Sequence, residues 1–156
     1  MSFKISRKQN HVAWGLFILA ALLAFTSTGC SKVTLISNYD EQIDQSATDL
    51  QKEMDRFLTN LEYQAGTPEA DYENNIDFYR HYLIEMRALL IRVQSHPDNQ
   101  ITEEQVRLMT DNLNELKAAH ESGQIEAEAI QVFRDLFNQG WGAIIKLEIA
   151  KKRGED

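Results

Sequence analysis

The most reactive side chain in this chain belongs to Cys30, its only cysteine. An ionised thiol is a strong nucleophile and accepts covalent modification readily. A single cysteine cannot form an internal disulfide, so in an exported protein it is free, paired with another chain, or modified. The residues directly before it, 26–29 (TSTG), are small and mostly polar.

The segment that leads to Cys30 is built like an export signal. Lys4, Arg7 and Lys8 are its charged residues, and an apolar run of 14 residues follows from Val12 to Phe25. A helix that spans a membrane needs about 20 apolar residues. The run is therefore short for a span, and its basic start is typical of a secretory signal peptide.

Residues 27–30 (STGC) resemble the lipobox of bacterial lipoproteins, with Ser27 where that family usually has Leu. The resemblance covers the first 31 residues. It implies cleavage between Gly29 and Cys30, and diacylglycerol plus an N-acyl chain such as palmitate on Cys30. Ser31, in place of Asp, implies the periplasmic leaflet of the outer membrane. An uncleaved signal anchor and ordinary signal-peptidase cleavage are the alternatives.

One group of side chains has the types that bind metals. Asp77, His81 and Glu85 are four residues apart and would share one face of a helix. Metal sites in helical bundles use Glu-x-x-His on two helices, and the chain contains no such motif. We therefore expect these residues to form surface pairs, for example with Arg80. We expect no metal, and no cofactor beyond the lipid on Cys30.

No motif indicates catalysis. The sequence contains no glycine-rich phosphate loop, no haem-attachment motif, no zinc-binding HExxH helix and no nucleophile elbow. Its carboxylates fall on polar helix faces, where nothing in the pattern indicates the burial that general acid–base catalysis requires. We expect a protein that is not an enzyme.

The composition indicates one acidic domain. The net charge is −8, and residues 1–29 hold three basic residues and no acidic one, so the rest of the chain is more acidic still. This charge argues against binding to nucleic acid and suits a domain that faces the periplasm. About 125 residues make one domain of ordinary size. Only two prolines and seven glycines occur, which favours long helices.

Apolar residues recur three and four positions apart in four stretches, as in amphipathic helices. The expected helices cover about 40–64, 68–94, 102–122 and 125–152. Gly66 suits a left-handed helix end. Thr67 and Pro68 predict the second start, and a capping box of Thr102 and Gln105 predicts the third.

These helices predict an all-α fold, an antiparallel four-helix bundle with up-down-up-down topology. A three-helix or partly open arrangement is the alternative. Gly140 and Gly142 predict a kink or loosened turn in the last helix, because glycine weakens a helix interior. The expected organisation is a signal peptide at 1–29, the lipidated cysteine and a short tether at 30–38, and the bundle at 39–153.

Two surfaces are candidates for contacts. Ile84, Ala88 and Ile91 form a second apolar line on the second helix. Such a line belongs either to a helix buried on two sides or to a contact with an envelope protein or a second copy.

The other candidate surface is the end of the last helix. Lys151, Lys152 and Arg153 complement the helix dipole there, and they could also touch anionic lipid.

From these features we expect a lipoprotein that acts through protein contacts as an envelope structural or accessory factor. The alternative is a bundle that senses a small ligand, with a cavity near Tyr79, Tyr82 and Trp141.

Overall fold

The structure, a computed structural model, describes residues 37–155, and these belong to one compact unit. The residues expected to form the signal peptide and lipobox, Cys30 among them, lie outside this range. Residues 37–155 contain no strand, and the predicted all-α fold is confirmed. The four α-helices are α2 (Glu41–Gln64), α3 (Ile76–Gln94), α4 (Gln100–Glu121) and α5 (Ala127–Glu155). Two 3-10 turns, η2 (Pro68–Ala70) and η3 (Tyr72–Asn74), precede α3.

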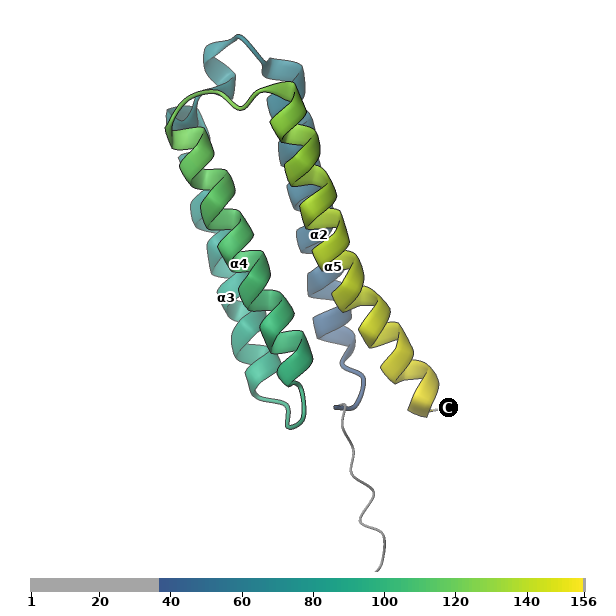
Figure 1. Ribbon diagram of the computed structural model, residues 1–156. Helices are drawn as coiled ribbons and strands as arrows, with labels where there is room; N and C mark the ends of the chain where they lie inside the picture. The colour runs from purple at the N-terminus through teal and green to yellow at the C-terminus, as the bar shows by residue number, and fades with distance from the viewer. Residues whose placement is uncertain (1–36, 156) are drawn as a thin grey trace, which may run out of the picture. The chain divides into compact units, whose positions relative to one another are not determined.

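The helices form a ring in which each one packs against its two neighbours, in the order α2, α3, α4, α5. Figure 1 shows α2 and α3 behind α4 and α5, with successive helices running in opposite directions. The antiparallel four-helix bundle is therefore confirmed. The start of α2, the loop between α3 and α4, and the end of α5 meet at one end of the bundle. No helix within residues 37–155 has an apolar stretch long enough to cross a bilayer.

Helix α2 begins and ends as its sequence predicts. The Asp40 side chain accepts hydrogen bonds from the backbone N–H groups of Gln42 and Ile43, at 2.8 and 3.1 Å, and so caps the helix. Gly66, just beyond the last turn, has φ +82°, the left-handed conformation that glycine adopts without strain. The apolar stripe of α2 enters the core as Ile43, Ala47, Leu50, Met54, Phe57, Leu58 and Leu61.

Helix α3 begins at Ile76, so the prediction of a start at Thr67 and Pro68 is wrong. Thr67 makes no side-chain cap hydrogen bond, and two 3-10 turns follow it. The side-chain amide of Asn74 bonds to the Pro68 carbonyl at 2.6 Å, and that of Asn75 bonds to backbone carbonyls of the same turns. Asparagine side chains that satisfy backbone carbonyls in this way compete with helix formation.

Helix α4 begins at Gln100, and the capping box predicted at Thr102 and Gln105 is wrong. Thr102 lies inside the first turn, where its side chain is buried and its hydroxyl is 3.4 Å from the Lys151 Nζ. A polar contact with α5 therefore occupies the hydroxyl that the sequence pattern assigned to a cap. The apolar stripe of α4 is confirmed in the core as Val106, Met109, Leu113 and Leu116.

Helix α5 continues unbroken through Gly140 and Gly142. Gly140 faces α4, and a Cβ at this position would collide with the buried side chain of Met109. The glycine thus permits a close approach of two helices, and it does not end or interrupt the helix. A Cβ at Gly142 would meet open space.

Candidate functional site

The apolar line on α3 lies on the solvent side of the bundle. Ile84 is 60 % exposed, Ile91 is 68 % exposed, and Ala88 between them is also exposed. Tyr82 and Leu89, which flank this line in the sequence, are instead buried in the core. Helix α3 therefore has a core face and, on its opposite side, an apolar strip of Ile84, Ala88 and Ile91, which we call the α3 strip.

A buried carboxylate holds the beginning of the bundle together. Asp40 Oδ2 forms an ion pair with the Arg92 guanidinium of α3 at 2.9 Å. His96 Nε2 lies 2.7 Å from the same oxygen. Burial by itself raises the pKa of the Asp40 carboxyl. The hydrogen bonds from Arg92 and from the backbone of α2 outweigh this effect and hold that pKa below its usual value. Asp40 is thus a helix cap and an ionic link between α2 and α3.

A second buried ion pair lies beside the first. Lys151 Nζ is 2.5 Å from Glu148 Oε1, and the Glu148 side chain is 0 % exposed. Lys151 also donates to Asn99 Oδ1 at 2.8 Å, and Glu148 Oε2 accepts from the Asp40 backbone N–H at 3.3 Å. The pair therefore joins α5 to the start of α2 and to the start of α4.

This arrangement corrects one member of the predicted membrane-contact group. Lys151 is only 6 % exposed, because its ammonium group pairs with Glu148 inside the bundle end. Lys152 and Arg153 are exposed. The Lys152 Nζ lies 5.0 Å from the ring centroid of Tyr39, a cation–π distance. Two of the three predicted cations therefore lie on the surface at this end.

The same end receives the chain that enters the bundle. The Ser37 backbone N–H donates to the Asp98 carbonyl at 3.0 Å, and its hydroxyl donates to Asn99 Oδ1 at 3.0 Å. Asp98 has φ +59°, a left-handed conformation that aspartate tolerates in turns. The loop between α3 and α4 therefore holds the chain before α2 begins.

His120, to which sequence reasoning assigned no role, is a buried connector at the other end. Its Nε2 bonds to the Ala70 carbonyl and its Nδ1 bonds to the Tyr79 hydroxyl, both at 2.8 Å. A carbonyl only accepts, so Nε2 carries the hydrogen of that bond, and in the neutral ring Nδ1 accepts from Tyr79. Burial raises the pKa of the Tyr79 hydroxyl, which stays a donor. These bonds join α4 to α3 and η2, so His120 serves the structure of the bundle.

Two of the three aromatic residues near which the ligand-sensing alternative expected a cavity, Tyr82 and Trp141, bond to each other at the centre of the bundle. Trp141 Nε1 donates to the Tyr82 hydroxyl at 2.9 Å, and this hydroxyl donates to the Leu50 carbonyl at 3.1 Å. Both aromatic side chains are 0 % exposed. They satisfy each other's polar groups and pack as core residues.

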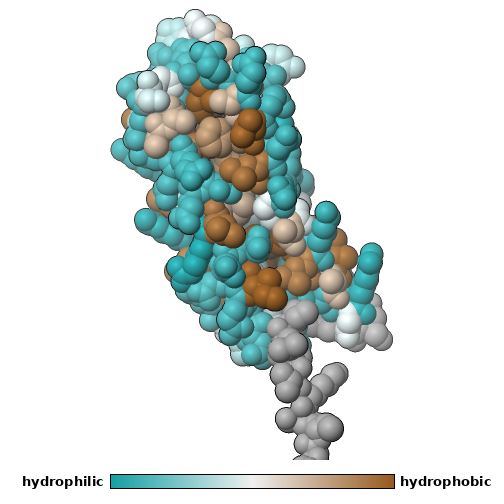
Figure 2. Space-filling view, in the orientation of Figure 1, coloured by the Kyte–Doolittle hydropathy of each residue, from teal (hydrophilic) through white to brown (hydrophobic). Residues whose placement is uncertain are grey.

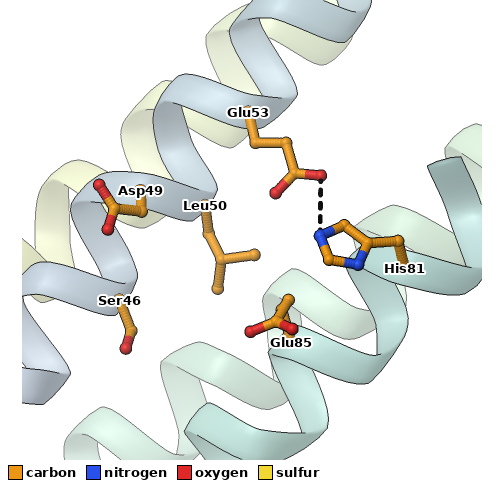
Figure 3. Close-up of a pocket in the computed structure, with 6 residues that line it drawn as sticks. All are labelled: Ser46, Asp49, Leu50, Glu53, His81 and Glu85. Atoms are coloured by element: carbon orange, nitrogen blue, oxygen red, sulfur yellow. Dashed lines mark ion pairs between the residues drawn. The ribbon is translucent and has the colours of Figure 1, made fainter.

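Two surface pockets flank α3. The first, of about 200 Å³, lies between α2 and α3, and Figure 3 shows Glu53 and His81 pointing toward each other across it, 3.7 Å apart. Its other lining residues are Ser46, Asp49, Leu50 and Glu85. Asp77 does not join it and pairs with Arg80 at 3.2 Å. Across residues 37–155, no group of three or more acidic, histidine or cysteine side chains is placed to hold a metal ion.

The second pocket, of about 270 Å³, lies between α3 and α4. Tyr72, Tyr79, Arg80 and Leu113 are among its lining residues. Pockets that bind drug-sized ligands usually have volumes of about 300–1,000 Å³. Both pockets are smaller than this range and open to solvent.

The face formed by α4 and α5 carries further exposed apolar side chains. Figure 2 shows this face, on which apolar side chains form a broken column over the two helices with hydrophilic ones on both sides. Ile101 and Leu108 of α4 are about half exposed. They belong to a different face from the α3 strip, since they lie on a different helix on the side of α5.

Comparisons of the chain with protein-family models, with curated proteins and with solved structures find no match.

Proposed function

We propose that the chain is a lipoprotein, held in the envelope through lipid on Cys30, whose helical bundle acts through protein contacts and not through catalysis. Its place is the periplasmic leaflet of the outer membrane, as a structural or accessory factor. The α3 strip supports the contact function, because Ile84 and Ile91 are exposed there while Tyr82 and Leu89 of the same helix are buried in the core. Exposed apolar side chains that gather in one large patch are typical of interaction sites.

The lipobox resemblance at residues 27–30 supports the anchor. Two or more acyl chains give stable attachment, since each buried CH₂ contributes about 0.8 kcal/mol. Six residues separate Cys30 from Ser37, the first residue that the structure ties to the bundle. Even fully extended, such a tether reaches only about 25 Å. The bundle would therefore work close to the lipid surface, with Lys152 and Arg153 at its membrane-facing end.

The test of the anchor uses Cys30→Ser in a bacterial host that processes lipoproteins, with a clickable palmitate analogue as the label. We expect the unsubstituted chain to incorporate label and to fractionate with membranes. The Cys30→Ser chain should lack label and accumulate as an unprocessed precursor. Ser31→Ala, which leaves the cysteine in place, is the matched control and should be labelled normally. Labelling that persists without Cys30, or an unsubstituted chain that is never labelled, would refute the anchor.

A further inference from the structure

The pocket between α3 and α4, which we call the α3–α4 pocket, has an apolar inner lining and basic edges. Its apolar lining residues come from η3, α3 and α4: Tyr72, Ile76, Tyr79, Leu83 and Leu113. Tyr79 and Leu113 are buried, so they lie deepest in the bundle. Arg80, Asn114 and Lys117 supply the polar groups, and these side chains are exposed or half-buried. The pocket is therefore apolar inside, with hydrogen-bond donors toward the solvent.

The polar lining of this pocket contains two cations and no carboxylate. The chain as a whole is acidic, with 24 acidic and 16 basic residues. The pocket between α2 and α3 follows this composition, since Asp49, Glu53 and Glu85 line it. At about 0.15 M salt, exposed charges more than about 8 Å apart are largely screened from each other. The lining groups therefore decide the charge of a ligand in the α3–α4 pocket, and they favour an anion.

Two carboxylates outside the pocket already pair with its cations. Asp77 Oδ1 accepts from Arg80 Nη1 at 3.2 Å, and Glu121 Oε1 accepts from Lys117 Nζ at 2.5 Å. The first pair is largely exposed and the second is partly exposed, and ion pairs in such positions are weak. A guanidinium has five N–H donors and an ammonium has three, so neither cation is used up by one bond. Asp77 and Glu121 therefore compete with an anionic ligand without excluding it.

The tyrosine rings favour an aromatic body for the ligand. The ring centroids of Tyr72 and Tyr79 lie 5.6 Å apart with an interplanar angle of 39°. The Lys117 Nζ lies 5.4 Å from the Tyr72 ring centroid, so a cation and an aromatic ring are neighbours in this lining. Aromatic rings pack favourably against one another in offset or tilted arrangements. The volume of about 270 Å³ lies below the usual range for drug-sized ligands, which limits the ligand to about one ring with a short side chain.

We propose that the α3–α4 pocket binds a small aromatic carboxylate. The ring of the ligand lies against Tyr72 and Leu83, and its carboxylate accepts hydrogen bonds from Arg80 and Lys117 at the edge of the pocket. A ligand of about ten non-hydrogen atoms in an open pocket binds weakly, with a Kd of about 1 mM. This ligand site goes beyond the proposed function, and it needs neither the lipid on Cys30 nor the α3 strip.

The experiment uses phenylpropionate as the probe. Phenylpropylammonium, which has the same apolar body and the opposite charge, is the matched control. Saturation-transfer difference NMR measures binding of each probe to the full-length chain in nanodiscs of phosphatidylcholine at about 0.15 M salt, with empty nanodiscs as the background. We expect phenylpropionate to saturate with a Kd of about 1 mM and the ammonium to bind at least about fivefold more weakly. No saturable binding of phenylpropionate below about 10 mM, or equal binding of the two probes, would overturn the proposal.

Substitutions at the edge of the pocket locate the bound carboxylate. Arg80→Gln and Lys117→Gln should each weaken phenylpropionate binding by at least about threefold, since each removes one cation at a partly exposed site. Lys146→Gln removes an exposed cation on α5 and should leave the Kd unchanged. Glu121→Gln should tighten binding by about twofold, because it removes the carboxylate that competes for Lys117. Equal losses in Lys146→Gln and the two pocket variants, or no gain in Glu121→Gln, would contradict the site. Circular dichroism should show the same helical signal for all four variants, since surface substitutions rarely affect folding.

Discussion

Replacing Lys151 with methionine should destabilise the bundle strongly, although sequence alone assigns this residue to the surface. The Lys151 and Glu148 side chains are 2 % and 0 % exposed, and their charged atoms lie 2.5 Å apart. Methionine would fill a similar volume but would leave the Glu148 carboxylate buried without its cation. Breaking a buried ion pair from one side costs about 3–5 kcal/mol, because desolvation of the remaining charge is no longer offset. The Asn99 side-chain oxygen, Oδ1, would also lose its hydrogen bond from Lys151.

The assay is thermal unfolding of the full chain in mild detergent, followed by the helical signal in circular dichroism. For a domain of about 120 residues, 1 kcal/mol shifts Tm by about 4 °C, so we expect a fall of about 10–20 °C. Lys146→Met is the matched control. Lys146 is exposed on the same helix, and its replacement should change stability by less than about 0.5 kcal/mol.

A double substitution separates the ion pair from simple packing. Glu148→Leu combined with Lys151→Met removes both charges, and we expect it to recover most of the lost stability, since an apolar pair of similar volume replaces a buried ion pair at little cost. If Lys151→Met lowered stability by less than about 1 kcal/mol, or if the double variant lost the sum of the two single effects, the reasoning would be refuted.

The remaining predictions concern the helix interior and acid stability. Gly142→Ala should raise stability by about 1 kcal/mol, since a methyl group there meets open space, whereas Gly140→Ala should lose this gain by colliding with the Met109 side chain; the Tm values of the two variants compare them directly. Because the folded-state pKa of Asp40 is below its ordinary 3.8, its contribution to stability should be complete above about pH 4 and lost as the pH falls further. The free energy of unfolding, measured with urea between about pH 6 and pH 2, should therefore fall less steeply with decreasing pH for Asp40→Asn than for the unsubstituted chain. An equal slope would contradict the role of the pair with Arg92.

Sequence periodicity located the helices well where each had one apolar stripe. The stripes of α2 and α4 are in the core as predicted. The buried face of α3 was harder to predict, because apolar residues occur around most of the circumference of this helix and more than one core face fits the pattern. Tyr82 and Leu89 are buried, whereas Leu83 and Leu90, which fit the three-and-four spacing of a core stripe equally well, are only half-buried. The line from Ile84 to Ile91 was visible in the sequence, but its exposure depended on how α3 was rotated.

The polar network at the bundle end could not be predicted from local pattern. Glu148 and Lys151 are three residues apart near a helix end, which is the usual pattern of a surface pair. Their burial depends on α4, whose Asn99 and Thr102 supply the partners for the ammonium group. Contacts between distant segments carry no signature in a single sequence. The role of Cys30 falls outside the described residues and stays a prediction.

The attachment of Ser37 to the loop between α3 and α4 has a mechanical consequence. A pull on the amino-terminal segment would not peel α2 away from its first turn alone. Through Asp98 and Asn99 the load reaches the loop, and through Asp40 it reaches both Arg92 of α3 and Glu148 of α5. Four segments would therefore share the tension. The point where the tether enters the bundle would resist detachment because several contacts must break together.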